Sequence, residues 1–360
     1  MPGRIAIFGA GAVGGQIAAR LATSGTPVSL IARGAHLAAI RAEGLALVTG
    51  GETIRAAVTA SDQASDLGIQ DLVIVALKGT QLPQAVEGIR PLVASHTRVL
   101  FAMNGLPWWF TDGLPAPIGA ALRLYLDPLG NIGAIVPSER SIWGVVTAGA
   151  AIVGPGTIRS TTPGANSIVL GYPDDRTDEP LRQAVEVLAR AGYRASVAPA
   201  IRRAIWSKLL TNAAQAMVAT ATNRDHVEVT TDPETRAVII AVMHEILAVG
   251  TAVGVDLAAD PVELSAPGRF GHHVSSFLQD LRAGRPLELA STILAVRELA
   301  RATAIAVPHL TTLAAIVAAQ SADAARARLR FSDGSTTRSG QAHRGDRAET
   351  AVRERAAPSS

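Results

Sequence analysis

The first hundred residues alternate between short, almost wholly apolar runs and segments whose apolar residues recur every three or four positions. Short apolar runs predict buried strands, and the three- to four-residue period predicts helices. We expect strands at 4–8, 28–32, 71–77 and 98–103, with helices at 13–23, 35–43 and 81–93. Apolar strands that alternate with helices are typical of a parallel sheet covered on both faces, which indicates a doubly wound α/β domain.

The pattern then changes. Residues 119–170 carry Gly, Thr and Val at strand-like spacing between turn sequences, which predicts antiparallel strands that complete the sheet. A helix at 181–191 and a last strand at 193–197 follow, and Pro199 marks a domain boundary.

The chain from 201 to about 330 keeps a helical period throughout, so we expect an all-α second domain. The last thirty residues are polar with mixed charges, which predicts a disordered tail. The expected organisation is therefore a Rossmann-type domain at 1–199, a helical domain at 200–330 and a tail at 331–360.

Composition narrows the class of protein. A chain of 360 residues is long enough for two domains, and the absence of cysteine excludes disulfides and thiolate sites. We expect no signal peptide and no spanning helix, and hence a cytoplasmic protein. The net charge of +3 is spread along the chain, so we expect neither a nucleic-acid nor a membrane partner. The sequence leaves open whether the protein forms a homodimer.

A glycine-rich loop follows the first strand and opens the first helix. Its sequence is Gly9-Ala10-Gly11-Ala12-Val13-Gly14. In this context the first glycine permits a tight turn, the second lets a pyrophosphate approach the backbone, and the third allows close helix packing. A generic strand–helix turn is the alternative, but it does not need three glycines at this spacing.

The segment after the loop indicates which dinucleotide binds. An NAD site places a carboxylate about 20 residues further on, yet no Asp or Glu occurs between Gly15 and Ala42. Arg33 stands there instead, and a guanidinium suits a 2′-phosphate. We therefore expect NADP(H), with His36 as a second, weaker candidate. The alternative for Arg33 is a solvated loop cation.

Two polar residues directly follow predicted strands. Lys78 comes after DLVIVAL, and Asn104 comes after VLFAM. Ligands of open α/β sheets bind beyond the carboxyl ends of the strands, so we expect both residues to face the cofactor. Each is also a residue type that forms ordinary turns.

The chain has thirty-one arginines but only two lysines, Lys78 and Lys208. Lys208 lies in a predicted helix with Asn212 one turn further on the same face. When hydride adds to a carbonyl carbon, the oxygen needs a proton. A buried ammonium group whose pKa is lowered can donate that proton, which arginine does badly. Glu288 is a candidate carboxylate within reach. A snorkelling surface lysine is the alternative.

Other polar residues carry weaker expectations. Adjacent histidines such as His272 and His273 face different ways on a helix, so we expect no metal site. We expect Gln279 and Asp280 to brace the helix that carries Ser276. Trp108 and Trp109 line a cleft mouth or lie in the core; the sequence leaves this open.

These motifs together resemble the ketopantoate reductases (2-dehydropantoate 2-reductases). The resemblance covers about residues 4–320 and consists of motifs that occur in the family's order and spacing: the GAGAVGG loop, Arg33, Lys78, the Asn-Gly of FAMNGLPWW, WSKLLTN and SSFLQDLRAGRPLEL. It implies a Rossmann-type NADP-binding domain followed by a helical domain like the C-terminal domain of 6-phosphogluconate dehydrogenase. It also implies a 2-oxo acid substrate bound between them.

The resemblance also implies roles for individual residues. Lys208 resembles the catalytic acid and Glu288 the functional carboxylate near it. Substrate contacts are implied for Asn104, Asn212 and Ser276. Cofactor contacts are implied for the loop residues Gly9, Ala10, Gly11, Ala12, Val13 and Gly14, and for Arg33, Lys78 and Asn104.

Two positions depart from the family pattern. The family usually has a second asparagine where this chain has Ala216, and an aspartate where it has Ala290. Loss of groups that hold a substrate hydroxyl changes selectivity. The first hypothesis is thus reduction of ketopantoate to (R)-pantoate in pantothenate biosynthesis, and the second is reduction of another 2-oxo acid. A third, a non-catalytic NADP-binding redox sensor, is disfavoured by the retained Lys208 and Glu288.

Overall fold

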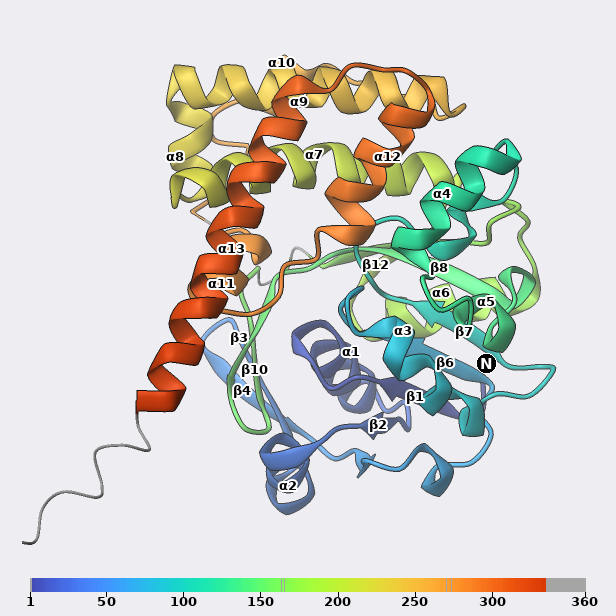
Figure 1. The fold of residues 1–360 in the computed structure, drawn as a ribbon. Helices are drawn as coiled ribbons and strands as arrows, with labels where there is room; N and C mark the ends of the chain where they lie inside the picture. The colour runs from blue at the N-terminus through green and yellow to red at the C-terminus, as the bar shows by residue number, and fades with distance from the viewer. Residues whose placement is uncertain (1, 163, 165, 270, 273, 335–360) are drawn as a thin grey trace, which may run out of the picture.

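The structure, a computed structural model, describes residues 2–334 apart from 163, 165, 270 and 273. An α/β part ends at Val197 and a helical part begins at Ile201 (Figure 1). The main sheet has eight strands in the order β12-β11-β8-β7-β6-β1-β2-β5. These strands are β1 (Ile5–Phe8), β2 (Ser29–Ile31), β5 (Thr59–Ser61), β6 (Leu72–Val75), β7 (Arg98–Phe101), β8 (Ser141–Thr147), β11 (Ser167–Gly171) and β12 (Arg194–Val197).

The central strands are buried on both faces, as their apolar sequences predict. In β1, Ile5 and Ile7 pack into a core with helix α1 (Ala12–Thr23), whereas Ala6 and Phe8 pack into a second core. That second core continues through the helices of the C-terminal part. The alternation of side chains along a strand therefore joins one face of the sheet to the second domain without a break.

A second sheet of four strands, in the order β4-β3-β10-β9, packs on the outer side of α1. Its strands are β3 (Leu45–Thr49), β4 (Glu52–Ala56), β9 (Ala150–Gly154) and β10 (Thr157–Ser160). The expectation that the strands of 119–170 complete the main sheet is therefore only partly right. β8 and β11 do belong to the main sheet and pair antiparallel, but β9 and β10 form a hairpin in the second sheet.

The remaining α/β elements correct other expectations. Residues predicted as strand near 119–126 form helix α4 (Ala116–Leu126), in which three of eleven residues are buried. The helix predicted at 81–93 is broken into α3 (Leu82–Ala85) and η2 (Val86–Leu92), and Pro91 lies inside the latter. The other elements are α2 (Gly34–Glu43), η1 (Ala64–Asp66), η3 (Trp108–Thr111), α5 (Ile132–Ile135), η4 (Ser138–Arg140) and α6 (Glu179–Arg190).

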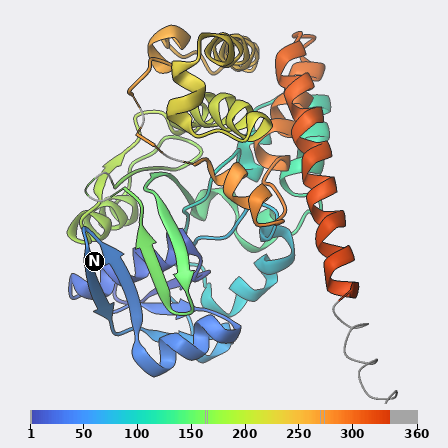
Figure 2. The same cartoon turned by 90° about the vertical axis from the view of Figure 1, so that its left-hand side faces the viewer.

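The helical part surrounds α7, which the other long helices contact. Its elements are α7 (Ile201–Thr222), α8 (His226–Thr231), α9 (Pro233–Ala252), α10 (Pro261–Leu264), α11 (Ser276–Arg282), the π-helical turn η5 (Ala290–Leu294), α12 (Ala295–Ala302) and α13 (Pro308–Gly334). Figure 2 shows α13 along one side of the molecule. This helix continues past residue 331, where a tail was expected; residues 335–360 lie outside the described part.

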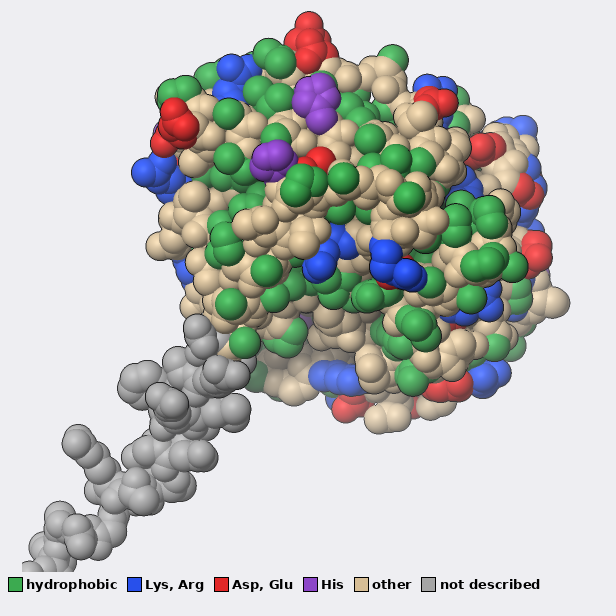
Figure 3. Space-filling model, turned by 45° about the horizontal axis from the view of Figure 1, so that its top comes forward, with side chains coloured by type: hydrophobic (Ala, Val, Ile, Leu, Met, Phe, Trp, Pro, Cys, Tyr) green, Lys and Arg blue, Asp and Glu red, His purple; other side chains and the backbone are tan. Residues whose placement is uncertain are grey.

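Helix α9 is long and apolar enough to cross a membrane by length and composition alone. Here it packs on α7, and its Glu245 carboxylate accepts hydrogen bonds from the backbone N–H groups of His309 and Leu310 at the start of α13. These contacts are those of a helix within a folded domain. On the face in Figure 3, positive and negative side chains are interspersed among apolar ones.

The crossing of α7 and α9 depends on Gly250. A Cβ atom at this position would meet Trp206 Nε1 and would lie 2.9 Å from the Val255 carbonyl oxygen. Trp206 is wholly buried, and its indole N–H donates to the Ile246 carbonyl at 3.2 Å.

We expect Gly250→Ala to destabilise the protein by about 1–3 kcal/mol, because overpacking displaces a buried indole. Gly154→Ala is the matched control, since a Cβ there meets nothing within 4 Å. Chemical unfolding of both variants measures the effect. Equal stability of the two variants would contradict this account of the helix crossing.

Candidate active site

Neighbouring parallel strands bring the predicted residues to one edge of the sheet. Phe8 pairs with Val75, and Val75 pairs with Phe101. Lys78 is three residues past Val75, and Asn104 is three residues past Phe101. Adjacent strands lie about 4.8 Å apart, so the two side chains belong to neighbouring strand ends at the same height. Gly11, three residues past Phe8, occupies the next position.

The glycine loop fits a dinucleotide pyrophosphate. Gly9 has a φ of +114°, and a Cβ there would lie 2.8 Å from the Ala76 carbonyl oxygen. A Cβ at Gly14 would collide with the Gly9 carbonyl oxygen, whereas one at Gly11 meets only Ala76 O, at 3.9 Å. The loop is therefore open to a ligand at Gly11. Helix α1 starts directly after it without a side-chain cap, so its first N–H groups can bind an anion.

Arg33 is an exposed residue directly before α2, just beyond the end of β2. His36, one turn further, is half-buried, and its Nδ1 accepts the Gly156 N–H at 2.8 Å. Burial lowers the pKa of His36, against a raising effect of its contact with the Ala10 backbone. His36 therefore links the hairpin of β9 and β10 to the glycine loop. Arg33, in contrast, faces solvent.

Lys208 lies on α7 over the end of β8. Its Nζ approaches Thr147 Oγ1 at 3.4 Å, and the side chain is half-buried. Burial lowers the pKa of the Lys208 ammonium. β8 is the neighbour of β7 in the sheet, so Lys208 extends the row formed by Gly11, Lys78 and Asn104.

The residues proposed for substrate contacts come from three elements. Asn104 follows β7, Asn212 lies one turn after Lys208 on α7, and Ser276 is the first residue of α11. All three side chains are exposed. Ser275, the buried neighbour of Ser276, caps α11 by accepting the Leu278 N–H at 3.1 Å.

Glu288 lies against the turn that follows β6. Its carboxylate accepts the Gly79 N–H at 2.7 Å, and no hydrogen bond or ion pair joins it to Lys208 within the described residues. Burial raises the pKa of Glu288; Gly79 and Lys78 oppose this effect, and Asp280 adds to it. The carboxylate therefore belongs to the Lys78–Gly79 turn in this structure, and its role as the carboxylate near Lys208 stays a prediction.

Lys78 forms the ion pair that joins the two parts of the chain. Its Nζ lies 2.5 Å from Asp280 Oδ2, and Arg285 Nε donates to Asp280 Oδ1 at 2.8 Å. The Asp280 side chain is 5% exposed, whereas that of Lys78 is 35% exposed. Asp280 was expected to brace the helix that carries Ser276. It also pairs with a lysine of the α/β part. Gln279 does brace the preceding loop, by donating to the Val274 carbonyl at 2.8 Å.

A backbone contact reinforces this junction. Leu106 N–H donates to the Ser291 carbonyl at 2.7 Å. A Cβ at Gly105 would lie 2.8 Å from that same carbonyl oxygen, and the φ of Gly105 is +87°. The loop after β7 therefore approaches η5 so closely that glycine is required at the Asn-Gly motif.

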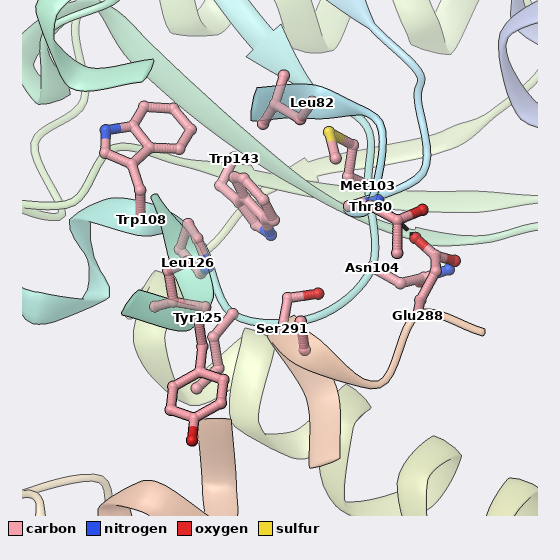
Figure 4. Close-up of a pocket in the computed structure, with 14 residues that line it drawn as sticks. Thr80, Leu82, Met103, Asn104, Trp108, Tyr125, Leu126, Trp143, Glu288 and Ser291 are labelled. Carbon is pink, nitrogen blue, oxygen red and sulfur yellow. Dashed lines mark hydrogen bonds between the residues drawn. The ribbon is translucent and has the colours of Figure 1, made fainter. Parts of the chain in front are cut away.

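A small pocket of about 30 Å³ opens behind Asn104 and Glu288 (Figure 4). Asn104, Glu288, Thr80 and Ser291 form its polar end, while Trp108, Trp143 and Leu82 lie at the apolar end. Trp108 and Trp109 are both buried in the same core, and Trp108 also lines the pocket. The full lining is Gly79, Thr80, Leu82, Met103, Asn104, Leu106, Pro107, Trp108, Tyr125, Leu126, Trp143, Glu288, Ala290 and Ser291.

Within the described residues, no group of three or more metal-binding side chains occurs. His272 instead pairs with Asp225 at 2.7 Å, and His273 lies outside the described part.

Sequence reasoning missed two contacts of the site. Thr147, the neighbour of Lys208, stands at a strand end like Lys78 and Asn104, and this position was its only signal. Asp280 had a clearer one, because it lies between Leu278 and Leu281 on a short helix, and a carboxylate that is buried needs a partner.

The comparisons agree with this geometry. Residues 5–175 match the family model "Ketopantoate reductase PanE/ApbA", and residues 200–321 match its C-terminal model. A 2-dehydropantoate 2-reductase of Mesorhizobium japonicum is 37% identical over 317 residues, which cover 87% of this chain and 96% of that protein.

Solved structures give the same result. A protein of Ralstonia solanacearum MolK2, provisionally named a ketopantoate reductase, superposes with a TM-score of 0.83 at 35% identity, covering 90% of this chain and 99% of its own. The ternary structure of a D-mandelate dehydrogenase with NADH and anilino(oxo)acetate shares the fold, with a TM-score of 0.75, 22% identity, and coverage of 89% and 99%. The chain belongs to the ketopantoate reductase family, oxidoreductases that reduce 2-dehydropantoate with a nicotinamide cofactor.

Proposed function

We propose that the protein reduces 2-dehydropantoate to (R)-pantoate with NADPH, in pantothenate biosynthesis, and that Lys208 is the general acid. The observation that carries this proposal is the position of Lys208, half-buried over the end of β8 and in one row with Gly11, Lys78 and Asn104. Cofactor and proton donor would then approach the same carbonyl group from two domains.

The chemistry needs a proton at one atom. NADPH, when bound, supplies the hydride that adds to the carbonyl carbon of the substrate. The carbonyl oxygen then takes a proton from the Lys208 ammonium. A donor works best when its pKa lies near the working pH, and burial moves the pKa of Lys208 in that direction. The exposed Asn104, Asn212 and Ser276 supply polar contacts for the carboxylate and carbonyl of the substrate.

Preference for NADPH over NADH is proposed from Arg33. Its exposed guanidinium stands just beyond β2, where an NAD site would place a carboxylate. The Gly79 and Lys78 turn would hold the nicotinamide side, with Glu288 fixing the backbone of that turn through Gly79 N–H.

Another 2-oxo acid is the second candidate substrate, and one observation favours it. Ala290 lines the pocket behind Asn104, and Ala216 is buried in the core of the helical domain. Neither methyl group can hold the hydroxyl group of ketopantoate, so the polar contacts available to that group are fewer than the family pattern provides.

Lys208→Ala is expected to lower kcat by about 10²–10⁴-fold, the usual contribution of a general acid. NADPH affinity should stay near the wild-type value, because Lys208 contacts the carbonyl rather than the dinucleotide. NADPH oxidation and fluorescence titration measure the two quantities. A variant with nearly normal turnover would rule out the mechanism.

Arg33→Ala is expected to weaken NADPH binding by about 10–100-fold, since it removes charge-assisted bonds to the 2′-phosphate. NADH has no such phosphate, and its affinity serves as the internal control. The nearby exposed Arg41 is the matched control position, because its Nε already donates to the Ala60 carbonyl at 3.0 Å. Equal losses for NADPH and NADH would contradict the assignment.

A panel of 2-oxo acids should rank ketopantoate first by kcat/KM if the first candidate is right. Ala290→Asp, which restores the family residue at the pocket, should then raise kcat/KM for ketopantoate relative to 2-oxo acids without a hydroxyl group. A clear preference for an apolar 2-oxo acid would establish the second candidate instead.

A further inference from the structure

Asp280 is a charged residue that the proposed mechanism does not use, although it is almost completely buried. A buried carboxylate needs partners because desolvation of an unpaired charge is costly. Both of its oxygens are engaged: Oδ2 by Lys78 at 2.5 Å and Oδ1 by Arg285 at 2.8 Å. The two bonds hold the carboxylate in one orientation, and that orientation determines where the Lys78 ammonium lies.

Lys78 is engaged only in part. An ammonium group has three N–H donors, and Asp280 takes one of them. Its side chain remains 35% exposed at the strand end beside Asn104. The remaining donors are therefore available to a bound ligand, and they are aimed by a carboxylate of the other domain.

We propose that Asp280 is a positioning residue for the reaction, because it holds the Lys78 ammonium beside Asn104 at the ends of β6 and β7. It acts from the second domain, so Lys78 is in place only when α11 is seated against the sheet. This inference rests on the proposed function, in which Lys78 holds the cofactor side of the site.

The same arrangement has an electrostatic consequence for Glu288. The charged groups near its carboxylate are Lys78, from the turn after β6, and Asp280, from α11; the Gly79 N–H binds it directly. The anionic Asp280 raises the pKa of Glu288, and Lys78 lowers it. Removal of the Asp280 charge should therefore move the Glu288 ionisation to lower pH.

A double-mutant cycle tests the proposal on the full-length protein. Asp280→Asn keeps the shape of the side chain and removes its charge. We expect about a tenfold loss in kcat/KM from this change, at least as large a loss from Lys78→Met, and a double variant within about twofold of Lys78→Met alone. Losses that multiply in the double variant would overturn the proposal.

Arg285→Met is the matched control, because it removes the other partner of Asp280 and leaves the Lys78 pair intact. Its kcat/KM should change by less than about threefold. A loss equal to that of Asp280→Asn would assign Asp280 a purely structural role. If Asp280→Asn does not fold, Asp280→Glu replaces it in the cycle, since it keeps the charge and displaces Lys78 by one methylene.

The pH profile of kcat/KM gives a readout that a purely structural role would not move. The ionisation that is absent in Glu288→Gln should appear at lower pH in Asp280→Asn than in the wild type. An unchanged position would contradict the proposal. If the wild type turns over no 2-oxo acid, the proposed function fails. The same cycle run on NADPH affinity then still decides whether Asp280 positions Lys78.

Discussion

The site depends on the contact between residues 280–291 of the helical part and the ends of strands β6 and β7. Here Leu106 N–H bonds the Ser291 carbonyl, Gly79 N–H bonds Glu288, and Lys78 pairs with Asp280. Each of these bonds joins residues from different domains. The apolar core that runs from one face of the sheet into the helices brings the two surfaces together, and the polar contacts fix their relative position.

The two lysines of the site lie in different electrostatic environments. Lys78 forms an ion pair with the buried Asp280 carboxylate. Lys208 has a hydroxyl neighbour, Thr147, and burial lowers its pKa. Lys78 is therefore held in place by an ion pair, whereas burial makes the Lys208 ammonium give up its proton more readily. This division agrees with a binding role for the first residue and proton transfer for the second.

Local sequence patterns predicted much of the fold and the positions of single residues. The apolar runs of β1, β6 and β7 and the glycine loop were located correctly because their signals lie within a few neighbouring residues. The positions of Lys78 and Asn104 at the sheet edge were predicted because each residue directly follows an apolar strand. The partners of Glu288 and Asp280 could not be predicted, because Gly79 and Lys78 are about 200 positions away in the chain. β4 was missed because it is largely exposed and lacks an apolar run, and α4 because its Gly and Ala content resembled the turn-rich segment that follows.

The scarcity of lysine gives the protein an unusual chemical property. Lys78 and Lys208 are its only side-chain amines. Lys78 follows β6, and Lys208 lies on α7 over the end of β8, so both face the same edge of the sheet. Reagents that acylate or reductively alkylate amines would thus modify side chains at the site itself, while thirty-one arginines keep the rest of the surface charged and unreactive. The half-exposed Lys78 and the more enclosed Lys208 would react at different rates. An isotope-labelled methyl group on each amine would therefore report on the two halves of the site separately, without any mutation.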